Sequence, residues 1–162
     1  MTALNQVSAQ VQLQQRVEQF KKLCHRRHLR VTEQRLEVFR MLAQSKAHPS
    51  VETIFEAVRK KLPNISLDTV YRTVASMEDA GVVFRVGASS RARFDADLTP
   101  HDHFVCMNCG EVYDIFPQAG APRPALPGNI ADFGKVMNVN LQFRGICNRC
   151  AQKAAAQDIQ KH

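Results

Sequence analysis

Two short stretches, Cys106-Met107-Asn108-Cys109 and Cys147-Asn148-Arg149-Cys150, decide the fold of this chain. Each is a Cys-x-x-Cys pair, whose two-residue spacer lets one tight turn supply two thiolates to the same ion. Zinc takes four thiolates at the corners of a tetrahedron, so the two pairs together complete one structural Zn²⁺ site. The 37 residues between the pairs exceed the usual gap of a zinc ribbon, and one ion is therefore predicted to hold a whole subdomain together.

Two other uses of cysteine pairs fit the sequence less well. A redox Cys-x-x-Cys normally stands alone at a strand-to-helix turn of a βαβ pattern, and no such pattern is seen in this sequence. Disulfides are typical of secreted chains, but Met1 to Gln15 is polar and lacks the apolar core of a signal peptide. The fifth cysteine, Cys24, falls on a predicted helix and is interpreted as an ordinary half-buried thiol.

The net charge of +7 is unevenly distributed. Residues 1–94 hold 16 Lys and Arg against 8 Asp and Glu, whereas residues 95–162 hold 6 against 7. This asymmetry suggests a module that binds a polyanion, joined to a part of another kind. Without a DNA-binding motif, solvated surface charge would explain it as well. No apolar run approaches the roughly 18 residues that cross a membrane, so a cytoplasmic protein without membrane contact is expected.

Apolar residues at helical spacing predict four helices in the basic part. They cover Val11–Arg27, a segment after the N-cap Thr32, about Ser50–Lys61, and Ser66–Ala80 with Ser66 as N-cap. Two predicted strands follow at Val82–Val86 and Arg91–Phe94, around a turn at Gly87–Ser90. Helices followed by a hairpin are typical of a winged helix, whose last helix enters the DNA major groove.

The part after residue 94 has a different texture, and its predicted elements are mainly strands. They are His103–Cys106, Glu111–Phe116 and Val136–Ile146, with a Pro-rich loop at Pro117–Gly128 and a helical tail from Ala151. The sequence therefore predicts an α+β protein with a domain at 1–94 and another at 95–162.

A second group of side chains suggests another metal site. His101 and His103 are two residues apart, so on a strand both imidazoles lie on the same side. Asp95 lies upstream, and Asp114 lies on the strand after the first cysteine pair. Two nitrogens and two carboxylates suit Fe²⁺ or Mn²⁺ better than the soft thiolate site does. Ordinary surface residues in polar turns remain the alternative.

The chain resembles the ferric-uptake-regulator (Fur) family from about Val17 to Cys150. The segments that carry the resemblance occur in the family's order. They are Arg30-Val31-Thr32-Glu33-Gln34-Arg35, Ala47-His48-Pro49-Ser50, Ser66-Leu67-Asp68-Thr69-Val70-Tyr71-Arg72, Arg93-Phe94-Asp95, His101-Asp102-His103-Phe104-Val105-Cys106-Met107-Asn108-Cys109-Gly110 and the final cysteine pair. The resemblance implies a winged-helix DNA-binding domain followed by an α/β dimerisation domain that carries the four-cysteine zinc.

Within the family, the sequence is most similar to the peroxide-sensing (PerR) branch. That branch binds its regulatory metal through three His and two Asp, and the counterparts are His48, Asp95, His101, His103 and Asp114. Asp114 is informative because iron-sensing members usually have Glu at this place. Zinc-sensing members use a Cys near the wing, and none occurs between Phe84 and His101. The region Met137–Asn140 lacks the His pair that several branches carry before the last cysteine pair.

The resemblance implies a homodimeric repressor that binds a double-stranded DNA operator and senses hydrogen peroxide. Iron-catalysed oxidation of His48 or His101 to 2-oxo-histidine would release the metal and lift repression, whereas Mn²⁺ would fill the site without this reaction. The chain is not expected to be an enzyme, because the sensor is consumed. The alternative is an iron- or manganese-responsive repressor of metal uptake without oxidation sensing.

Candidate DNA contacts follow from side-chain chemistry. Tyr71 can pack on thymine methyl groups and Arg72 can read guanine. Phosphate or minor-groove contacts are predicted for Arg30, Ser66, Thr69, Arg91 and Arg93. Two structural alternatives remain open, since Tyr71 could belong to the core and Ser66 could serve as a helix cap alone. A metal-dependent hydrolase would need a general base and a substrate pocket, and no further carboxylate or nucleophile in the sequence has the spacing to provide them. A thiol oxidoreductase would need cysteine pairs free of zinc.

Overall fold

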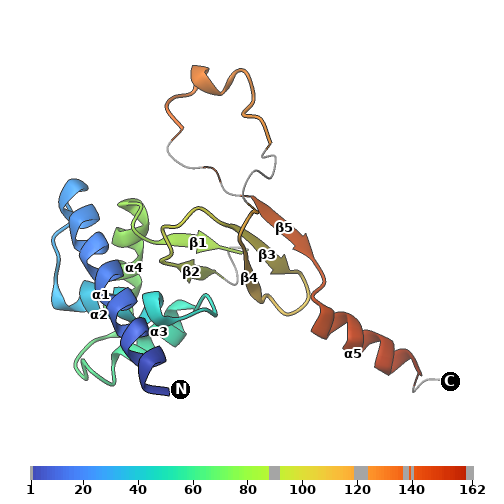
Figure 1. Cartoon of the computed structure of the whole chain (residues 1–162), viewed down its shortest axis with the longest axis horizontal. Coiled ribbons are helices and arrows are strands. Elements are labelled where there is room, and N and C mark those ends of the chain that lie inside the picture. The colour runs from blue at the N-terminus through green and yellow to red at the C-terminus, as the bar shows by residue number, and fades with distance from the viewer. Residues whose placement is uncertain (1, 88–91, 119–123, 137–138, 140, 160–162) are drawn as a thin grey trace. The chain divides into compact units, whose positions relative to one another are not determined.

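The computed structural model describes residues 2–87, 92–118, 124–136, 139 and 141–159. Its chain divides into two compact units, Met1–Leu98 and Thr99–His162 (Figure 1). Arg91 and most of the predicted turn at Gly87–Ser90 lie outside the described residues. The roles assigned to residues 1–94 and 95–162 stay predictions. No helix among the described residues is long and apolar enough to cross a bilayer.

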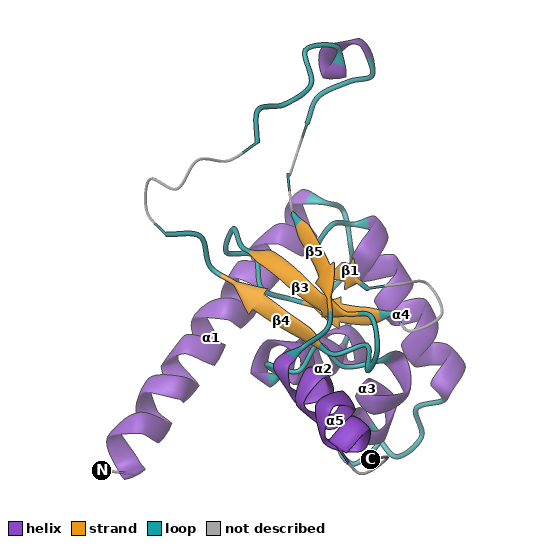
Figure 2. Ribbon diagram, turned by 90° about the vertical axis from the view of Figure 1, so that its right-hand side faces the viewer, coloured by secondary structure: helices purple, strands orange, loops and turns teal. Residues whose placement is uncertain are grey.

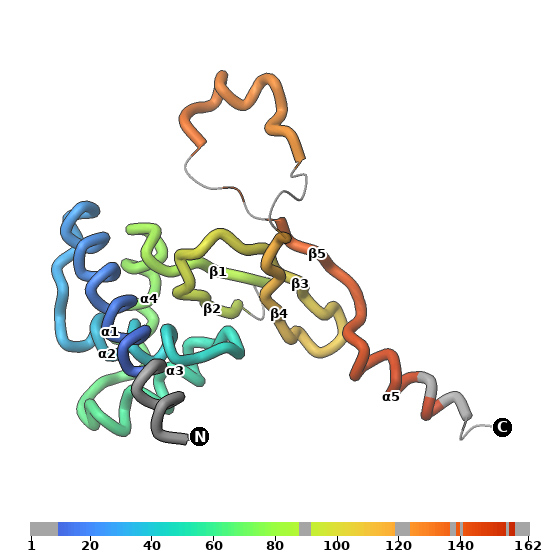
Figure 3. The backbone as a smooth tube through the Cα atoms, in the orientation of Figure 1, coloured from blue at the N-terminus to red at the C-terminus, as the bar shows by residue number. Residues whose placement is uncertain are grey.

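The described part of the first unit contains the four predicted helices. They are α1 (Thr2–Arg26), α2 (Glu33–Gln44), α3 (Val51–Val58) and α4 (Leu67–Asp79), and Figure 3 follows the chain through them. The first helix begins nine residues earlier than predicted, because its polar first turns carry good helix formers but no apolar periodicity. The third ends three residues earlier, with Arg59 as its C-cap.

Local side-chain hydrogen bonds start three of these helices, and two of the caps, Thr32 and Ser66, were predicted. The hydroxyl groups of Thr32, Ser50 and Ser66 accept hydrogen bonds from the backbone N–H three residues later. Each bond satisfies one of the donors that the first helical turn leaves without a partner. Gly81 ends α4 with φ +66°. Its N–H donates to the Glu78 carbonyl, and the Val82 N–H donates to the Met77 carbonyl. This Schellman arrangement needs a left-handed residue, which glycine adopts without strain.

The core of the first unit lies between these helices. α2 packs against α1, α3 and α4, and the rings of Phe20 and Phe39 stack with centroids 4.1 Å apart. Both rings are buried. Cys24 is fully buried, and burial raises the pKa of its thiol, which makes it a core residue rather than a half-buried one.

A short hairpin completes the unit. β1 (Phe84–Val86) pairs antiparallel with β2 (Arg93–Asp95), and Arg85 lies opposite Phe94. Val82 and Val83, predicted as strand, lie in the turn after α4, because their N–H groups donate to the Met77 carbonyl. Three of the four helices, together with this hairpin, form the predicted winged helix.

The second unit is built on a three-stranded sheet in the order β4-β3-β5. β3 (Asp102–Cys106) runs antiparallel to β4 (Val112–Ile115) and parallel to β5 (Gln142–Gly145), as Figure 2 shows. The strand predicted at Glu111–Phe116 is shorter, since β4 ends at Ile115 where its pairing with β3 ends. The strand predicted at Val136–Ile146 is found at Gln142–Gly145, and residues 137, 138 and 140 lie outside the described residues. A 3₁₀ turn, η2 (Ile130–Asp132), precedes β5, and α5 (Asn148–Ile159) ends the described chain.

Removing the buried ring of Phe39 should destabilise the first unit. The Phe39→Ala change leaves a cavity beside Phe20 and is expected to cost about 3–5 kcal/mol of unfolding free energy. Urea denaturation followed by circular dichroism measures this cost. In the control Val11→Ala, the side chain removed is 48% exposed, and the change should stay within about 0.5 kcal/mol. Equal effects of the two substitutions would contradict the assigned core.

Candidate metal centres

The four cysteines of the two pairs come together in the second unit. Their Sγ atoms all lie within 4.8 Å of one another, and the Cys109 and Cys147 sulfurs are 3.8 Å apart. Four sulfurs bound to one Zn²⁺ at about 2.3 Å would be separated by about 3.8 Å. A disulfide would require about 2.05 Å, and all five cysteines are free thiols. The geometry therefore fits a tetrahedral zinc site.

Hydrogen bonds around each cysteine pair shift the pKa values of the thiols. N–H groups of Cys109, Cys147 and Asn108 donate to the Cys106 sulfur and lower the pKa of its thiol to about 6. A hydrogen bond from the Cys150 N–H lowers the pKa of Cys147, at the start of α5. The thiol of Cys150 donates to the Cys147 sulfur, which raises the pKa of Cys150. Zinc binding would therefore displace a proton held by Cys150.

A backbone turn and two side chains surround this cluster. Gly110 has φ +73° and its N–H donates to the Cys106 carbonyl, so the first pair closes as a tight turn. Arg149 donates to the Cys109 sulfur at 3.7 Å and to Glu111 at 3.3 Å. Its positive charge offsets part of the negative charge that four thiolates leave on a Zn²⁺ site. No sequence pattern indicated this role of Arg149.

A second cluster lies on one face of the same sheet. His103 on β3 pairs directly with Asp114 on β4, so both side chains lie on the same side. The Nε2 atoms of His101 and His103 are 3.0 Å apart, and the Asp114 Oδ1 lies 3.4 Å and 3.7 Å from them. Donor atoms about 2.1 Å from one ion would be separated by about 3.0 Å in an octahedral site and about 3.5 Å in a tetrahedral one.

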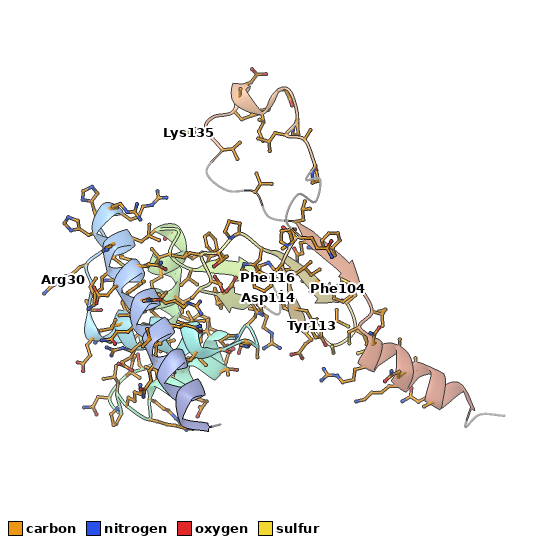
Figure 4. All side chains as sticks on the ribbon, in the orientation of Figure 1. Arg30, Phe104, Tyr113, Asp114, Phe116 and Lys135 are labelled. Atoms are coloured by element: carbon orange, nitrogen blue, oxygen red, sulfur yellow. The ribbon has the colours of Figure 1, made fainter. Side chains whose placement is uncertain are left out.

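The surroundings of His101 favour metal binding through Nε2. Its Nδ1 lies 2.7 Å from the Thr99 carbonyl, and a proton on Nδ1 leaves Nε2 as the donor atom for an ion. Phe116 stacks on the imidazole with ring centroids 5.3 Å apart. Figure 4 labels Asp114 on β4 and Phe116 just after it. Neither Thr99 nor Phe116 could be recognised from the sequence.

Asp102, between the two histidines, has a structural role. It is buried, and its Oδ1 accepts a hydrogen bond from the Leu141 N–H at 3.1 Å. This bond fixes the chain just before β5 against β3.

The remaining predicted ligands belong to the first unit. His48 and Asp95 are both buried there, and the Pro49 carbonyl accepts a hydrogen bond from the Phe94 N–H at 3.1 Å. This bond joins the residue after His48 to the residue before Asp95. His48 has φ +43°, a left-handed conformation that is uncommon for residues other than glycine and clusters at functional sites.

Four of the predicted DNA contacts, Ser66, Thr69, Tyr71 and Arg72, lie at the start of α4. Ser66, Tyr71 and Arg72 are exposed, and Thr69 is half-buried. Tyr71 is 46% exposed and donates a hydrogen bond to Glu52, so the core alternative for Tyr71 is wrong. Ser66 is the helix cap, and Arg72 pairs with Asp68 at 2.7 Å. Of the other candidates, Arg30 is exposed, Arg93 is half-buried, and Arg91 is not described.

Comparison with known proteins decides the family. The sequence profile described as "Ferric uptake regulator family" matches residues 26–119. The chain belongs to the ferric uptake regulator family. Its fold is that of the Fur family, as the sequence predicted, and it is a metal-responsive repressor rather than an enzyme.

Individual relatives agree with this assignment. The chain is 32% identical over 127 residues to the peroxide-responsive repressor PerR of Staphylococcus epidermidis, covering 77% of this chain and 83% of the relative. It is 31% identical over 126 residues to the peroxide operon regulator of Bacillus subtilis, covering 77% and 86%. The Helicobacter pylori ferric uptake regulator, whose structure has three functional metal-binding sites, shares the fold. The TM-score is 0.61 at 23% identity, with 86% and 93% of the two chains covered.

The predicted cofactors are confirmed for the family and for the two clusters of donor atoms. A structural Zn²⁺ suits the four thiolates, and a regulatory Fe²⁺ or Mn²⁺ suits the histidine and aspartate donors. The residue-by-residue assignment of ligands and DNA contacts stays a prediction.

Replacing one cysteine of the pairs should remove the zinc. The Cys109→Ser protein is expected to fall from about one zinc per chain to near zero, because the tetrahedral site then lacks a thiolate. Elemental analysis after dialysis measures the zinc content. The control Cys24→Ala should keep its zinc, since Cys24 lies in the core of the first unit. Zinc lost equally from both variants would contradict the assigned site.

Proposed function

We propose that this chain is a homodimeric repressor that senses hydrogen peroxide by oxidation of a histidine ligand of its regulatory metal. The observation that carries the proposal is the group formed by His101, His103 and Asp114, whose donor atoms are spaced as the ligands of one ion are. Nitrogen and carboxylate donors suit Fe²⁺, which reacts with peroxide, and Mn²⁺, which can replace it. The peroxide regulators among the relatives support the same signal.

His48 and Asp95 complete the proposed regulatory site. Both belong to the first unit, and the hydrogen bond between Pro49 and Phe94 keeps their segments together there. The left-handed backbone of His48 is the kind of strain that persists where function requires it. The structural Zn²⁺ is assigned to Cys106, Cys109, Cys147 and Cys150.

An ion held by ligands from both units would connect metal binding to DNA binding. In a dimer, the separation of the two α4 helices must match DNA half-sites about 34 Å apart, or a multiple of this distance. A metal that binds the matching arrangement more tightly shifts the population toward it. Moving such an equilibrium from mostly inactive to mostly active requires about 5.5 kcal/mol of differential binding. Loss of two of the five proposed ligands, His48 and Asp95, is a change large enough to supply this difference in binding free energy.

The DNA contacts are proposed on the exposed end of α4. Tyr71 and Arg72 would contact bases, and Ser66 and Thr69 would contact phosphates. Glu52 accepts the hydrogen bond of the Tyr71 hydroxyl and so limits the orientations of this ring. Phosphate or minor-groove contacts are proposed for Arg30, Arg91 and Arg93, in keeping with the positive charge of residues 1–94.

The chemical step consumes one histidine. Fe²⁺, if held by these residues, would supply the one-electron chemistry that splits hydrogen peroxide next to its ligands, and it would be regenerated, so that the histidine is the net electron donor. The imidazole of His48 or His101 gains one oxygen atom at the carbon between its nitrogens and is oxidised by two electrons, while peroxide is reduced to water. The product, 2-oxo-histidine, is a poor ligand, so the site loses a donor and operator affinity falls.

The test compares operator binding before and after peroxide. An operator is first selected from random DNA with the Mn²⁺-loaded protein, and its affinity is then measured for the Mn²⁺ and Fe²⁺ forms. Peroxide should weaken binding of the Fe²⁺ form by about tenfold or more, the equivalent of 1.4 kcal/mol, and leave the Mn²⁺ form unchanged. Peptide mass spectrometry should find one added oxygen on His48 or His101. Binding by the Fe²⁺ form that survives peroxide would instead favour a repressor that senses metal alone.

Substitution of a proposed ligand tests the connection between metal and DNA. His48→Ala and Asp114→Asn should each abolish most of the gain in operator affinity on addition of Mn²⁺, because the metal no longer distinguishes the active arrangement. Fluorescence anisotropy with labelled operator at a series of Mn²⁺ concentrations measures the gain. His25→Ala is the control, since His25 is exposed on α1. A Mn²⁺ response of wild-type size in both ligand variants would reject the proposed site.

A further inference from the structure

Arg16 on α1 bridges two distant segments of the first unit. Its Nη1 donates to the Ala43 carbonyl at 2.7 Å, near the end of α2. Its Nη2 donates to the Ala96 carbonyl at 3.1 Å and lies 4.0 Å from the Asp97 Oδ2. The Arg16 side chain is 31% exposed, so these bonds are partly screened from water.

The segment that Arg16 holds contains a proposed metal ligand. Ala96 follows Asp95 directly, and the Asp95 Oδ1 accepts a hydrogen bond from the Asp97 N–H at 2.7 Å. This bond orients the Asp95 carboxylate, and Arg16 fixes the peptide between the two residues that form it. Both Asp95 and Ala96 are buried. The orientation of the carboxylate therefore depends on a contact made by the first helix, eighty residues away in sequence.

We infer that Arg16 is a positioning residue for the regulatory metal, because it holds the backbone that presents Asp95. This inference rests on the proposed function, in which Asp95 is a ligand. A planar guanidinium can donate to two carbonyl groups in a fixed geometry, which a lysine ammonium cannot reproduce. With Arg16 in place, the Asp95 segment is ordered before the ion arrives, and metal binding need not supply the cost of ordering it.

The experiment measures Mn²⁺ affinity without DNA. Mn²⁺ is titrated into the zinc-containing chain, and the free ion is followed by electron paramagnetic resonance. Arg16→Ala should raise the Kd for Mn²⁺ about fivefold or more, the scale of one lost hydrogen bond to a charged group. Arg16→Lys should show a smaller increase. The control Lys21→Ala removes a positive charge from the same helix, where Lys21 bonds to Glu18 on the helix surface. The Mn²⁺ affinity of this variant should match that of the wild type.

The outcomes separate this inference from the proposed function. The inference is rejected if the Kd of Arg16→Ala for Mn²⁺ stays within about twofold of the wild-type value, at a temperature where both proteins are folded. A twofold change in Kd is smaller than the change expected from the loss of one hydrogen bond. A purely structural role would lower the melting temperature and leave that Kd unchanged. If Arg16→Ala does not fold, Arg16→Lys decides by the same criterion. A wild-type chain that binds no Mn²⁺ rejects the proposed function instead.

Discussion

The register between β3 and β4 is the constraint on which both metal centres depend. His103 lies opposite Asp114 and Val105 lies opposite Val112. Cys106 is the last residue of β3, and Cys109 lies in the turn that follows it. A slip by one residue would move Asp114 to the other face of the sheet. An ion bound by both cysteines prevents this slip, because it fixes the length of the connection. The zinc site therefore sets the geometry of the regulatory donors without contacting them.

The two donor sets differ in how firmly they hold an ion. Four thiolates form a closed soft site, in which backbone N–H groups already favour the ionised form of Cys106 and Cys147. The histidine and aspartate donors are harder and suit ions that exchange more readily. A permanent ion and an exchangeable one can thus share a strand, since β3 carries His103 near its start and ends at Cys106. This division of roles is what a metal-responsive repressor requires.

The sequence predicted what local chemistry determines. The helix caps at Thr32 and Ser66 were predicted because a cap is a hydrogen bond over three residues. The sequence predicted that the four cysteines come together, because the Cys-x-x-Cys spacing is typical of a zinc site. Strand lengths could not be predicted in the same way, because a strand ends where its partner ends. The partner of β5 is β3, which is far away in sequence. The bonds from Arg16 to Ala43 and Ala96 leave no pattern in the sequence at all.

Prior ordering of the ligands determines how much of the metal's binding energy can act on DNA affinity. In the second unit, the sheet register and the Thr99 contact place the donors of His103, Asp114 and His101 before any ion binds. In the first, Arg16 restrains the segment that presents Asp95. An ion that finds its ligands ordered within each unit loses little energy in arranging them. In the proposed function, the remainder would be available to favour the DNA-binding state, and it would be the coupling free energy of an allosteric switch.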